Sequence, residues 1–294
     1  MFRLKALAPA ALVFAISGAA SAQTAGPGVA PQYDTTHVYV APDQMDAFAA
    51  AFTTTFGGAA GKPATMDVTP TPSSTTFRAF VTPVGSLSVF AFTTPIPYPF
   101  GEERTGYLVR DMDAAIAAAR RAGAEVVVTP FPDPIGRDAV IRWPGGVNMQ
   151  LYWHTTPPSY APFVTVPENR VYVSADAADA LVRDFIAFSG GRLVADEAKA
   201  PGAEIGRPGE TYRRIRLVSD FGRMTVLVTD GHLPWPYGRE LTGYEVSNLA
   251  DTLAKARAAG VEVLAGPYST SERDAAMLRF PGGYIAEIHA FRAD

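Results

Sequence analysis

The sequence predicts an α+β protein of four modules, each with the order strand, helix and three strands. An internal repeat is the first observation behind this. Residues 105–130 (TGYLVRDMDAAIAAARRAGAEVVVTP) align without gaps to residues 242–267 (TGYEVSNLADTLAKARAAGVEVLAGP), 137 positions later, with 12 of 26 residues identical. Hydrophobic periodicity is the second, because in each module one amphipathic helical stretch follows a short alternating segment and precedes further strand-like runs.

In the first half, HVYVA is a short strand and DQMDAFAAAFTTTF is a helix that ends at Gly57-Gly58, a helix stop signal. Alternating or β-rich runs then predict strands around 63–69, 76–82 and 86–93. The pattern restarts with a strand at 105–110 and a helix at 111–122 that ends at Gly123. The remaining strands of this half are expected at 125–129, 138–143 and 147–154.

The second half repeats this order of elements. It predicts helices at 176–189 and 248–259, with strands at 170–174, 191–195, 211–218, 223–229, 242–247, 261–265, 274–280 and 284–291. The offset of 137 also relates PYPFGEER (97–104) to PWPYGREL (234–241), and RWPGG (142–146) to RFPGG (279–283). We therefore expect one domain at 35–154 and another at 169–294, joined by a Pro-rich linker at 155–168.

The N-terminus is typical of a secretory signal. Arg3 and Lys5 precede a short apolar run, and Ala20-Ser21-Ala22 supplies a small-residue cleavage pattern that would end a signal peptide at residues 1–22. Pro9 interrupts the apolar run, which argues against a membrane anchor. We expect a flexible leader at 23–34 and an exported protein, periplasmic or secreted.

Composition excludes several classes of function. Of the 294 residues, 48% are hydrophobic and 18% charged, which suits a globular fold. The net charge of −4 comes without a Lys/Arg run, so no nucleic-acid partner is expected. The sequence has no cysteine, which excludes thiol nucleophiles, disulfides and zinc-thiolate sites. A small-molecule ligand remains the expected partner, for a monomer or homodimer.

The module order, together with GYLVRDMDAAIAAARRAGAEV and RWPGGVNMQLYW, resembles the vicinal oxygen chelate superfamily. Glyoxalase I, bleomycin-resistance proteins and extradiol dioxygenases belong to it. The resemblance implies that two modules form one cup-shaped domain with its helices on the convex side, so this chain would hold two tandem cups. Because functions vary widely within the fold, the fold alone does not give the reaction.

The resemblance also implies a divalent metal in a cup, held by His or Gln on the first strand of each module and Glu on the last. The corresponding positions are His37, Arg104 and Gln150 in the first half, and Arg170, Leu241 and Glu287 in the second. Neither half contains the usual triad, and a divalent site needs about three protein ligands. The cofactor is therefore left open: none, or a divalent Fe, Mn, Zn or Ni.

Strand parity adds candidates to the first cup. His37 shares a face with Tyr39, and Gln150 with Tyr152, because side chains two positions apart point to the same side. His37 is either a hydrogen-bonded core partner of Gln150, or a general base or metal ligand. In the second case Arg104 could bind a substrate carboxylate in bidentate fashion, and Tyr39, Gln150 and Tyr152 would contact the substrate.

In the second cup, parity brings together Arg170, Glu245, Glu287 and His289. Three interpretations remain open. In the first, Arg170 and Glu287 form a structural ion pair. In the second, Glu245, Glu287 and His289 form an unconventional metal site. In the third, the cluster binds or protonates a substrate without metal. A further alternative pairs module one with module four, which would place His37 and Glu287 in one cup as two metal ligands.

The repeated loops carry Tyr98 and Trp235, and Glu103 and Glu240, at equivalent positions. They either pin a crossover or form an aromatic wall for a flat ligand. The leading hypothesis is an exported, glyoxalase-like protein that acts on a small oxygenated or aromatic molecule as a lyase, isomerase or dioxygenase. The alternative is a metal-free protein that binds and sequesters small molecules, as in the bleomycin-resistance branch.

Overall fold

The computed structural model describes residues 26–29, 35–156 and 165–292. In the first half the elements are β1 (Thr35–Tyr39), η2 (Pro42–Gln44), α1 (Met45–Phe56), β2 (Ala59–Ala60), β3 (Ala64–Met66), β4 (Thr75–Thr82), β5 (Gly85–Phe92), β6 (Thr105–Leu108), α2 (Met112–Arg121), β7 (Glu125–Pro132), β8 (Gly136–Trp143) and β9 (Val147–His154). The predicted elements are present, with boundaries within a few residues.

In the second half they are β10 (Glu168–Val173), α3 (Ala175–Ser189), β11 (Arg192–Pro201), η3 (Gly202–Ile205), β12 (Thr211–Ser219), β13 (Gly222–Val228), β14 (Leu241–Glu245), α4 (Leu249–Ala258), β15 (Glu262–Ser269), β16 (Arg273–Arg279), η4 (Pro281–Gly283) and β17 (Ile285–Phe291). Strands β7, β11 and β15 extend beyond their expected ends. The pairing of each of these strands with its neighbour contains two register shifts, which are typical of β-bulges.

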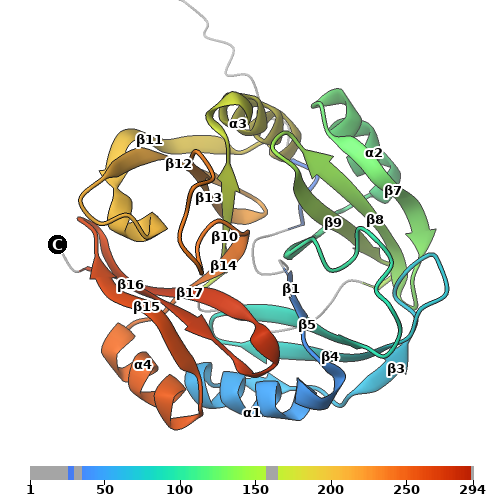
Figure 1. Cartoon of the computed structure of the whole chain (residues 1–294). Helices are drawn as coiled ribbons and strands as arrows, with labels where there is room; N and C mark the ends of the chain where they lie inside the picture. The colour runs from blue at the N-terminus through green and yellow to red at the C-terminus, as the bar shows by residue number, and fades with distance from the viewer. Residues whose placement is uncertain (1–25, 30–34, 157–164, 293–294) are drawn as a thin grey trace, which may run out of the picture.

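Each half forms one curled sheet (Figure 1). The strand order is β2-β4-β5-β1-β6-β9-β8-β7 in the first sheet, with β3 beside β4, and β11-β12-β13-β10-β14-β17-β16-β15 in the second. At the centre of each sheet the first strands of its two modules run antiparallel, β1 against β6 and β10 against β14. The fold is thus the α+β arrangement of four modules in two tandem cups that the sequence predicted.

This topology decides how the modules pair. Strand β1 lies between β5 and β6, whereas β17 lies between β14 and β16 in the other sheet. His37 and Glu287 therefore belong to different cups. The alternative in which modules one and four form one cup is wrong, because the strands of module one pair with those of module two in a single sheet.

Modules one and four do meet, but on their convex sides. Helix α1 packs against α4, and Phe52 of α1 lies 5.3 Å from Phe280 between ring centroids. In the same way α2 and α3 share a core in which the ring of Trp143 lies 5.3 Å from that of Phe188. Burying a side chain of this size stabilises a fold by about 1.5–3 kcal/mol. Both cores cross the domain boundary and hold the two halves together.

The helix starts are encoded locally and repeated. Asp111 caps α2 by accepting a hydrogen bond from the backbone N–H of Ala114 at 2.8 Å. Asn248, 137 positions later, caps α4 in the same way through the N–H of Asp251 at 3.0 Å. Such a cap is worth about 1 kcal/mol.

Part of the expected leader, residues 26–29, contacts the folded domains. Gly28 forms a β-bridge with Val109, and the backbone N–H of Val29 donates to the carbonyl oxygen of Leu108 at 3.1 Å. Residues 26–29 therefore pair with the segment at the end of β6, near Phe221 of the second domain. The signal peptide expected at 1–22 lies outside the described residues, as do residues 157–164 of the expected linker.

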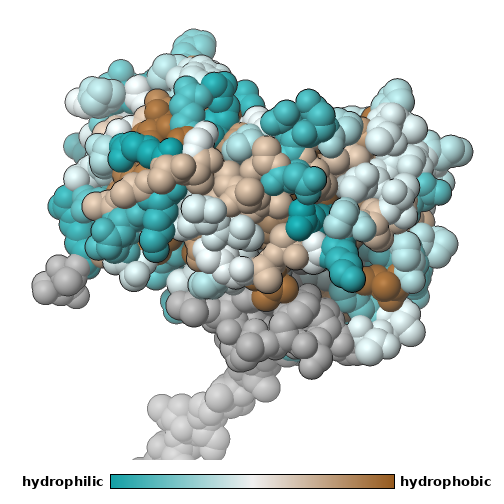
Figure 2. Space-filling view, turned by 90° about the horizontal axis from the view of Figure 1, so that it is seen from below, coloured by the Kyte–Doolittle hydropathy of each residue, from teal (hydrophilic) through white to brown (hydrophobic). Residues whose placement is uncertain are grey.

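Seen from below, moderately hydrophobic residues run between hydrophilic ones across the middle of the molecule, and the strongly hydrophobic spots are small and separate (Figure 2). The exposed large apolar side chains are scattered, Tyr98 and Trp235 of the repeated loops among them. Within the described residues, every helix is too short or too polar to cross a membrane.

Candidate functional site

The concave face of the first sheet carries an aromatic wall. The strand registers place Phe77 of β4 opposite Phe90 of β5, and Phe90 opposite Tyr39 of β1. Ring centroids are 5.6 Å apart for Phe77 and Phe90, and 5.3 Å for Phe90 and Tyr39. Three neighbouring strands thus present one apolar, flat surface to the inside of the cup.

The opposite wall is polar. Gln150 and Tyr152 of β9 share the concave face, and Asp138 of β8 lies directly opposite Tyr152. His154, at the end of β9, lies beside Tyr152 with the two rings tilted and 5.1 Å between their centroids. This wall belongs to the second module, so the cup combines an apolar side from module one with a polar side from module two.

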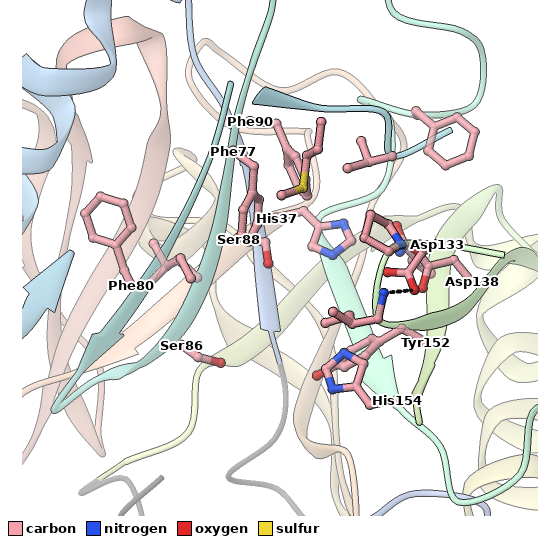
Figure 3. Close-up of a pocket in the computed structure, with 18 of the residues that line it drawn as sticks. His37, Phe77, Phe80, Ser86, Ser88, Phe90, Asp133, Asp138, Tyr152 and His154 are labelled. Atoms are coloured by element: carbon pink, nitrogen blue, oxygen red, sulfur yellow. Dashed lines mark hydrogen bonds between the residues drawn. The ribbon is translucent and has the colours of Figure 1, made fainter. Parts of the chain in front are cut away.

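A cavity of about 300 Å³ lies between the two walls and is lined by residues of both. His37 stands at the middle of it. Figure 3 shows the imidazole between Phe77 and Phe90 on one side and Asp133 and Asp138 on the other. The candidate site is therefore a pocket with one aromatic side, one polar side and a single imidazole between them.

His37 is held by a buried carboxylate. Its Nδ1 lies 3.3 Å from Oε1 of Glu103, and the hydroxyl of Tyr39 donates a hydrogen bond to the same oxygen. Glu103 is completely buried, and its other oxygen has no hydrogen-bond partner among the described residues. Burial, together with the Glu103 carboxylate, raises the pKa of Tyr39 well above its usual range, so this hydroxyl keeps its proton.

The local chain explains why these groups meet. Glu103 comes from the loop before β6, and the next residue, Arg104, accepts a backbone hydrogen bond at 3.0 Å from the N–H of His37. On the other side of the imidazole, a Cβ at Gly106 would lie only 2.5 Å from His37 Nε2. A glycine is therefore required beside the ring, because any side chain would displace it.

Asp138 is the second titratable group of the cavity. Burial raises its pKa well above the usual range, and the nearby carboxylates of Asp133 and Glu103 add to the effect. Burial also lowers the pKa of His154, which favours the neutral imidazole. The polar wall is thus suited to holding a proton on Asp138 while its histidine stays uncharged.

Arg104 does not point into this cup. Its Nη1 donates to the carbonyl oxygen of Gly101 at 2.6 Å, and its guanidinium lies 5.9 Å from the centre of the Tyr39 ring. It lines a separate cavity between the domains instead. Of the candidates proposed for the first cup, His37, Tyr39, Gln150 and Tyr152 line its cavity. Their roles remain predictions.

The second cup is filled by charged side chains. Arg170 donates from Nη1 to Glu168 at 2.6 Å and from Nη2 to Glu204 at 2.8 Å. Arg273 binds the same two carboxylates at 3.1 and 2.7 Å. Arg214 adds a bond of 2.8 Å to Glu204, a residue that η3 inserts into the cup. The guanidinium groups hold the pKa of Glu204 and that of Glu168 below their usual range, against the opposing effect of burial.

Glu287 and His289 adjoin this network. Oε2 of Glu287 lies 2.7 Å from Nδ1 of His289, while its Oε1 is 3.8 Å from Nη1 of Arg170 and 3.8 Å from Nη2 of Arg273. Arg170 is thus near Glu287, as one interpretation expected, but its shortest contacts are with other carboxylates. Glu245, which the sequence grouped with them, pairs instead with Arg223 at 2.6 Å.

These donor sets do not fit a divalent metal ion. In the first cup only His37 and Gln150 of the three implied positions face the cavity, and Gly106 stands beside them. In the second cup two guanidinium groups approach Glu287 and would repel a cation. Among the described residues, no three His, Asp or Glu side chains gather in a way that could hold a metal.

Several site residues were missed by sequence reasoning. Asp138 had a signal, since it is a lone acid at the start of a buried, apolar strand. Glu103 was recognised as part of a repeated loop but not as the partner of His37. Glu168, Glu204 and Arg273 come from distant elements, and only the folded sheet brings them together.

Comparison with known proteins shows which class of fold this is. No protein-family model matches the sequence, and no curated protein matches it. Solved structures do match, and together with the four modules they show that the chain has the tandem, two-domain vicinal oxygen chelate fold. Sequence identities of 12–14% in these matches mean that the likeness concerns the fold.

Among the similar structures is a triple mutant of 4-hydroxymandelate synthase from Streptomyces coelicolor, with a TM-score of 0.62 and 14% identity over 91% of this chain and 94% of that one. A Mn(II)-bound glyoxalase from Novosphingobium aromaticivorans has a TM-score of 0.55 and 13% identity over 90% and 82% of the two chains. The 2,3-dioxygenase LapB from Pseudomonas sp. KL28 has a TM-score of 0.52 and 12% identity over 88% and 92%.

Proposed function

We propose that the first cup binds a small, flat, oxygenated molecule and acts on it by proton transfer, as an isomerase or lyase. The observation that carries this proposal is the cavity in which an aromatic wall faces His37 and Asp138. Aromatic side chains favour a flat ligand, and the polar groups opposite them suit its oxygen atoms.

The chemistry follows from the partners of each group. When Nδ1 of His37 carries the proton and donates to Glu103, the Nε2 lone pair is available to accept a proton from the ligand. Asp138, with its raised pKa, returns a proton at another atom of the same ligand. One proton leaves and one arrives, so the step is balanced as an isomerisation and needs no co-reactant.

Sequestration of a ligand without turnover is the second candidate. It is favoured by the donor sets, because among the described residues neither cup brings three metal ligands together. In that case the imidazole and the carboxyl group would serve only to hydrogen-bond the ligand.

A binding and turnover assay with the mature chain separates the two. Catechol, 4-hydroxymandelate and phenylglyoxal would be titrated in a thermal-shift assay, and each binder followed by NMR for conversion. Conversion that His37→Gln abolishes while binding persists supports the enzyme. Binding without conversion supports sequestration. If the double variant Phe90→Ala/Asp138→Asn still binds the ligand saturably, the ligand binds outside this cup.

Metal removal gives an independent check. We expect dialysis against a chelator, and later addition of Mn²⁺, Fe²⁺ or Zn²⁺, to leave the melting temperature unchanged. One equivalent of metal per chain that is lost in Glu287→Ala would contradict this and restore the metalloenzyme hypothesis.

We further propose that the protein is exported, because residues 1–22 have the pattern of a secretory signal. Fractionation of a Gram-negative host that expresses the full chain should place the protein in the periplasm, with Gln23 as its first residue. A chain that starts at residue 23 should stay in the cytoplasm, and retention of both forms there would contradict export.

A further inference from the structure

A second cavity, of about 250 Å³, lies between the two domains, apart from the first cup. The first domain contributes the loop residues Glu102 and Arg104, and the turn and strand start from Gly145 to Asn148. The second domain contributes β10 at Val171 and Tyr172, and the loop residues Arg239 and Glu240. Both copies of the repeated loop therefore meet in this one place.

The repeat shows that the polar lining is particular to this copy. Arg104 and Asn148 correspond to Leu241 and Ile285 at the offset of 137. In the second domain those two residues pack together with Met277 in a buried hydrophobic cluster. The same framework is thus filled by apolar side chains in one half and lined by a guanidinium and an amide in the other.

The charged groups of this cavity are not neutralised by one another. Arg239 makes no ion pair or hydrogen bond within the part of the chain that the structure describes, and Arg104 bonds only backbone carbonyl oxygens. Oε1 of Glu240 is buried without a hydrogen-bond partner among those residues. Burial raises the pKa of Glu240 to about 8, so near neutral pH this side chain is mostly an uncharged O–H donor. Glu102 is the other carboxylate among the described residues that line the cavity.

We propose that this inter-domain cavity binds a small carboxylate or similar oxyanion. Guanidinium groups bind carboxylates through paired, charge-assisted hydrogen bonds. The geometry supplies two of them, Arg104 and Arg239, on opposite sides of the domain boundary, with the amide of Asn148 beside them. A bound anion would bridge the two domains.

Calorimetric titration of the full chain with malonate, acetate and sulfate, at constant ionic strength set with chloride, tests this site. We expect saturable binding of at least one of the three, weakened about tenfold or more in Arg239→Gln, because one charge-assisted pair is lost. The matched control is Arg192→Gln, which removes an exposed arginine of β11 that does not line the cavity. The affinity of Arg192→Gln for the anion should equal that of the wild type.

The repeat itself supplies a second variant. Arg104→Leu combined with Asn148→Ile installs the residues that the second domain uses at the same positions, so the fold should be kept while the polar lining is lost. Binding should then disappear with circular dichroism unchanged. Binding that survives this double variant, an equal loss in Arg192→Gln, or the absence of saturable binding in the wild type would each overturn the proposal.

The pH dependence of the anion affinity is a further test, because a purely structural role of Arg239 would not produce it. Above pH 8 Glu240 is ionised beside Arg104 and Glu103. Glu102 and Arg239 line the same cavity, and the charge on Glu240 would repel a bound anion there. Affinity should therefore fall as pH rises from 7 to 9, and Glu240→Gln should flatten this fall. An identical pH profile in both proteins would contradict the assignment of the site to this cavity.

Discussion

Nδ1 of His37 lies 3.3 Å from Oε1 of Glu103, which joins the first strand of module one to the loop that precedes module two. The second half does not repeat this pair at the equivalent positions. There it holds Arg170, which binds Glu168 and Glu204, and Glu240, which lines the inter-domain cavity. One cup has thus kept an imidazole beside an open cavity, while the other has been filled by ion pairs.

The tautomer of His37 is the first testable consequence. A carboxylate at Nδ1 favours the tautomer with the proton on that nitrogen. With only four histidines in the chain, ¹⁵N-labelled imidazoles can be resolved by NMR and His37 assigned with His37→Gln. We expect the Nδ1–H form in the wild type and a mixture in Glu103→Gln. If the chain is an enzyme, turnover should fall by about 10–100-fold in that variant. An unchanged tautomer in Glu103→Gln would contradict the pairing.

Asp138 should make stability depend on pH. Its pKa is raised in the folded state, so the native protein binds this proton more tightly than the unfolded chain does. The stabilisation is fully present below the unfolded pKa of about 3.9 and is lost as pH rises through the raised value. Asp138→Asn should therefore match the wild type at acidic pH and melt on the order of a few °C higher at pH 9.

Thermal melts of both proteins across that range measure the difference. Asp113→Asn is the control, because Asp113 is exposed and Arg137 lowers its pKa instead. A melting difference for Asp138→Asn that stays constant with pH would show that this carboxyl is not perturbed.

Arg170 is expected to be essential for stability. Arg170→Met would leave Glu168 and Glu204 buried with less compensating charge, which costs about 3–5 kcal/mol in the free energy of unfolding. Arg183→Met removes an exposed ion pair with Asp184 and should change stability by only about 0.5 kcal/mol. Urea denaturation compares the two. Equal effects would mean that the second-cup network contributes little to stability.

Gly106 should control the position of the His37 imidazole. The added methyl group of Gly106→Ala would lie 2.5 Å from His37 Nε2, so the ring must move, with an overpacking cost of about 1–3 kcal/mol. We expect the free energy of unfolding to fall in Gly106→Ala. The rate of ligand conversion should fall with it or, if the protein only binds its ligand, the affinity for that ligand. Gly243→Ala, the equivalent change in the second cup, should lower stability without affecting the ligand. Normal ligand handling by Gly106→Ala would show that the imidazole has no role.

Much of the fold could be read from the chain. The repeat, the glycines that end helices and the two-residue alternation are local signals, and each specifies an element without reference to distant residues. They predicted the four modules, with element boundaries within a few residues except at the longer strands β7, β11 and β15. Parity also placed His37 and Tyr39 on one face and Gln150 and Tyr152 on another, because the side-chain direction in a strand depends only on sequence spacing.

Tertiary structure decided what those faces meet. Glu103 reaches His37 only after β1 and β6 pair, and Glu204 enters the second cup only because η3 folds across it. Arg104 follows directly after Glu103 in the chain, yet its side chain lines the cavity between the domains. Sequence spacing fixes which neighbours point the same way along one strand. Contacts between buried charges instead depend on the distance across strands and loops far apart in the chain, and that distance is set only when the sheets curl and the two domains pack.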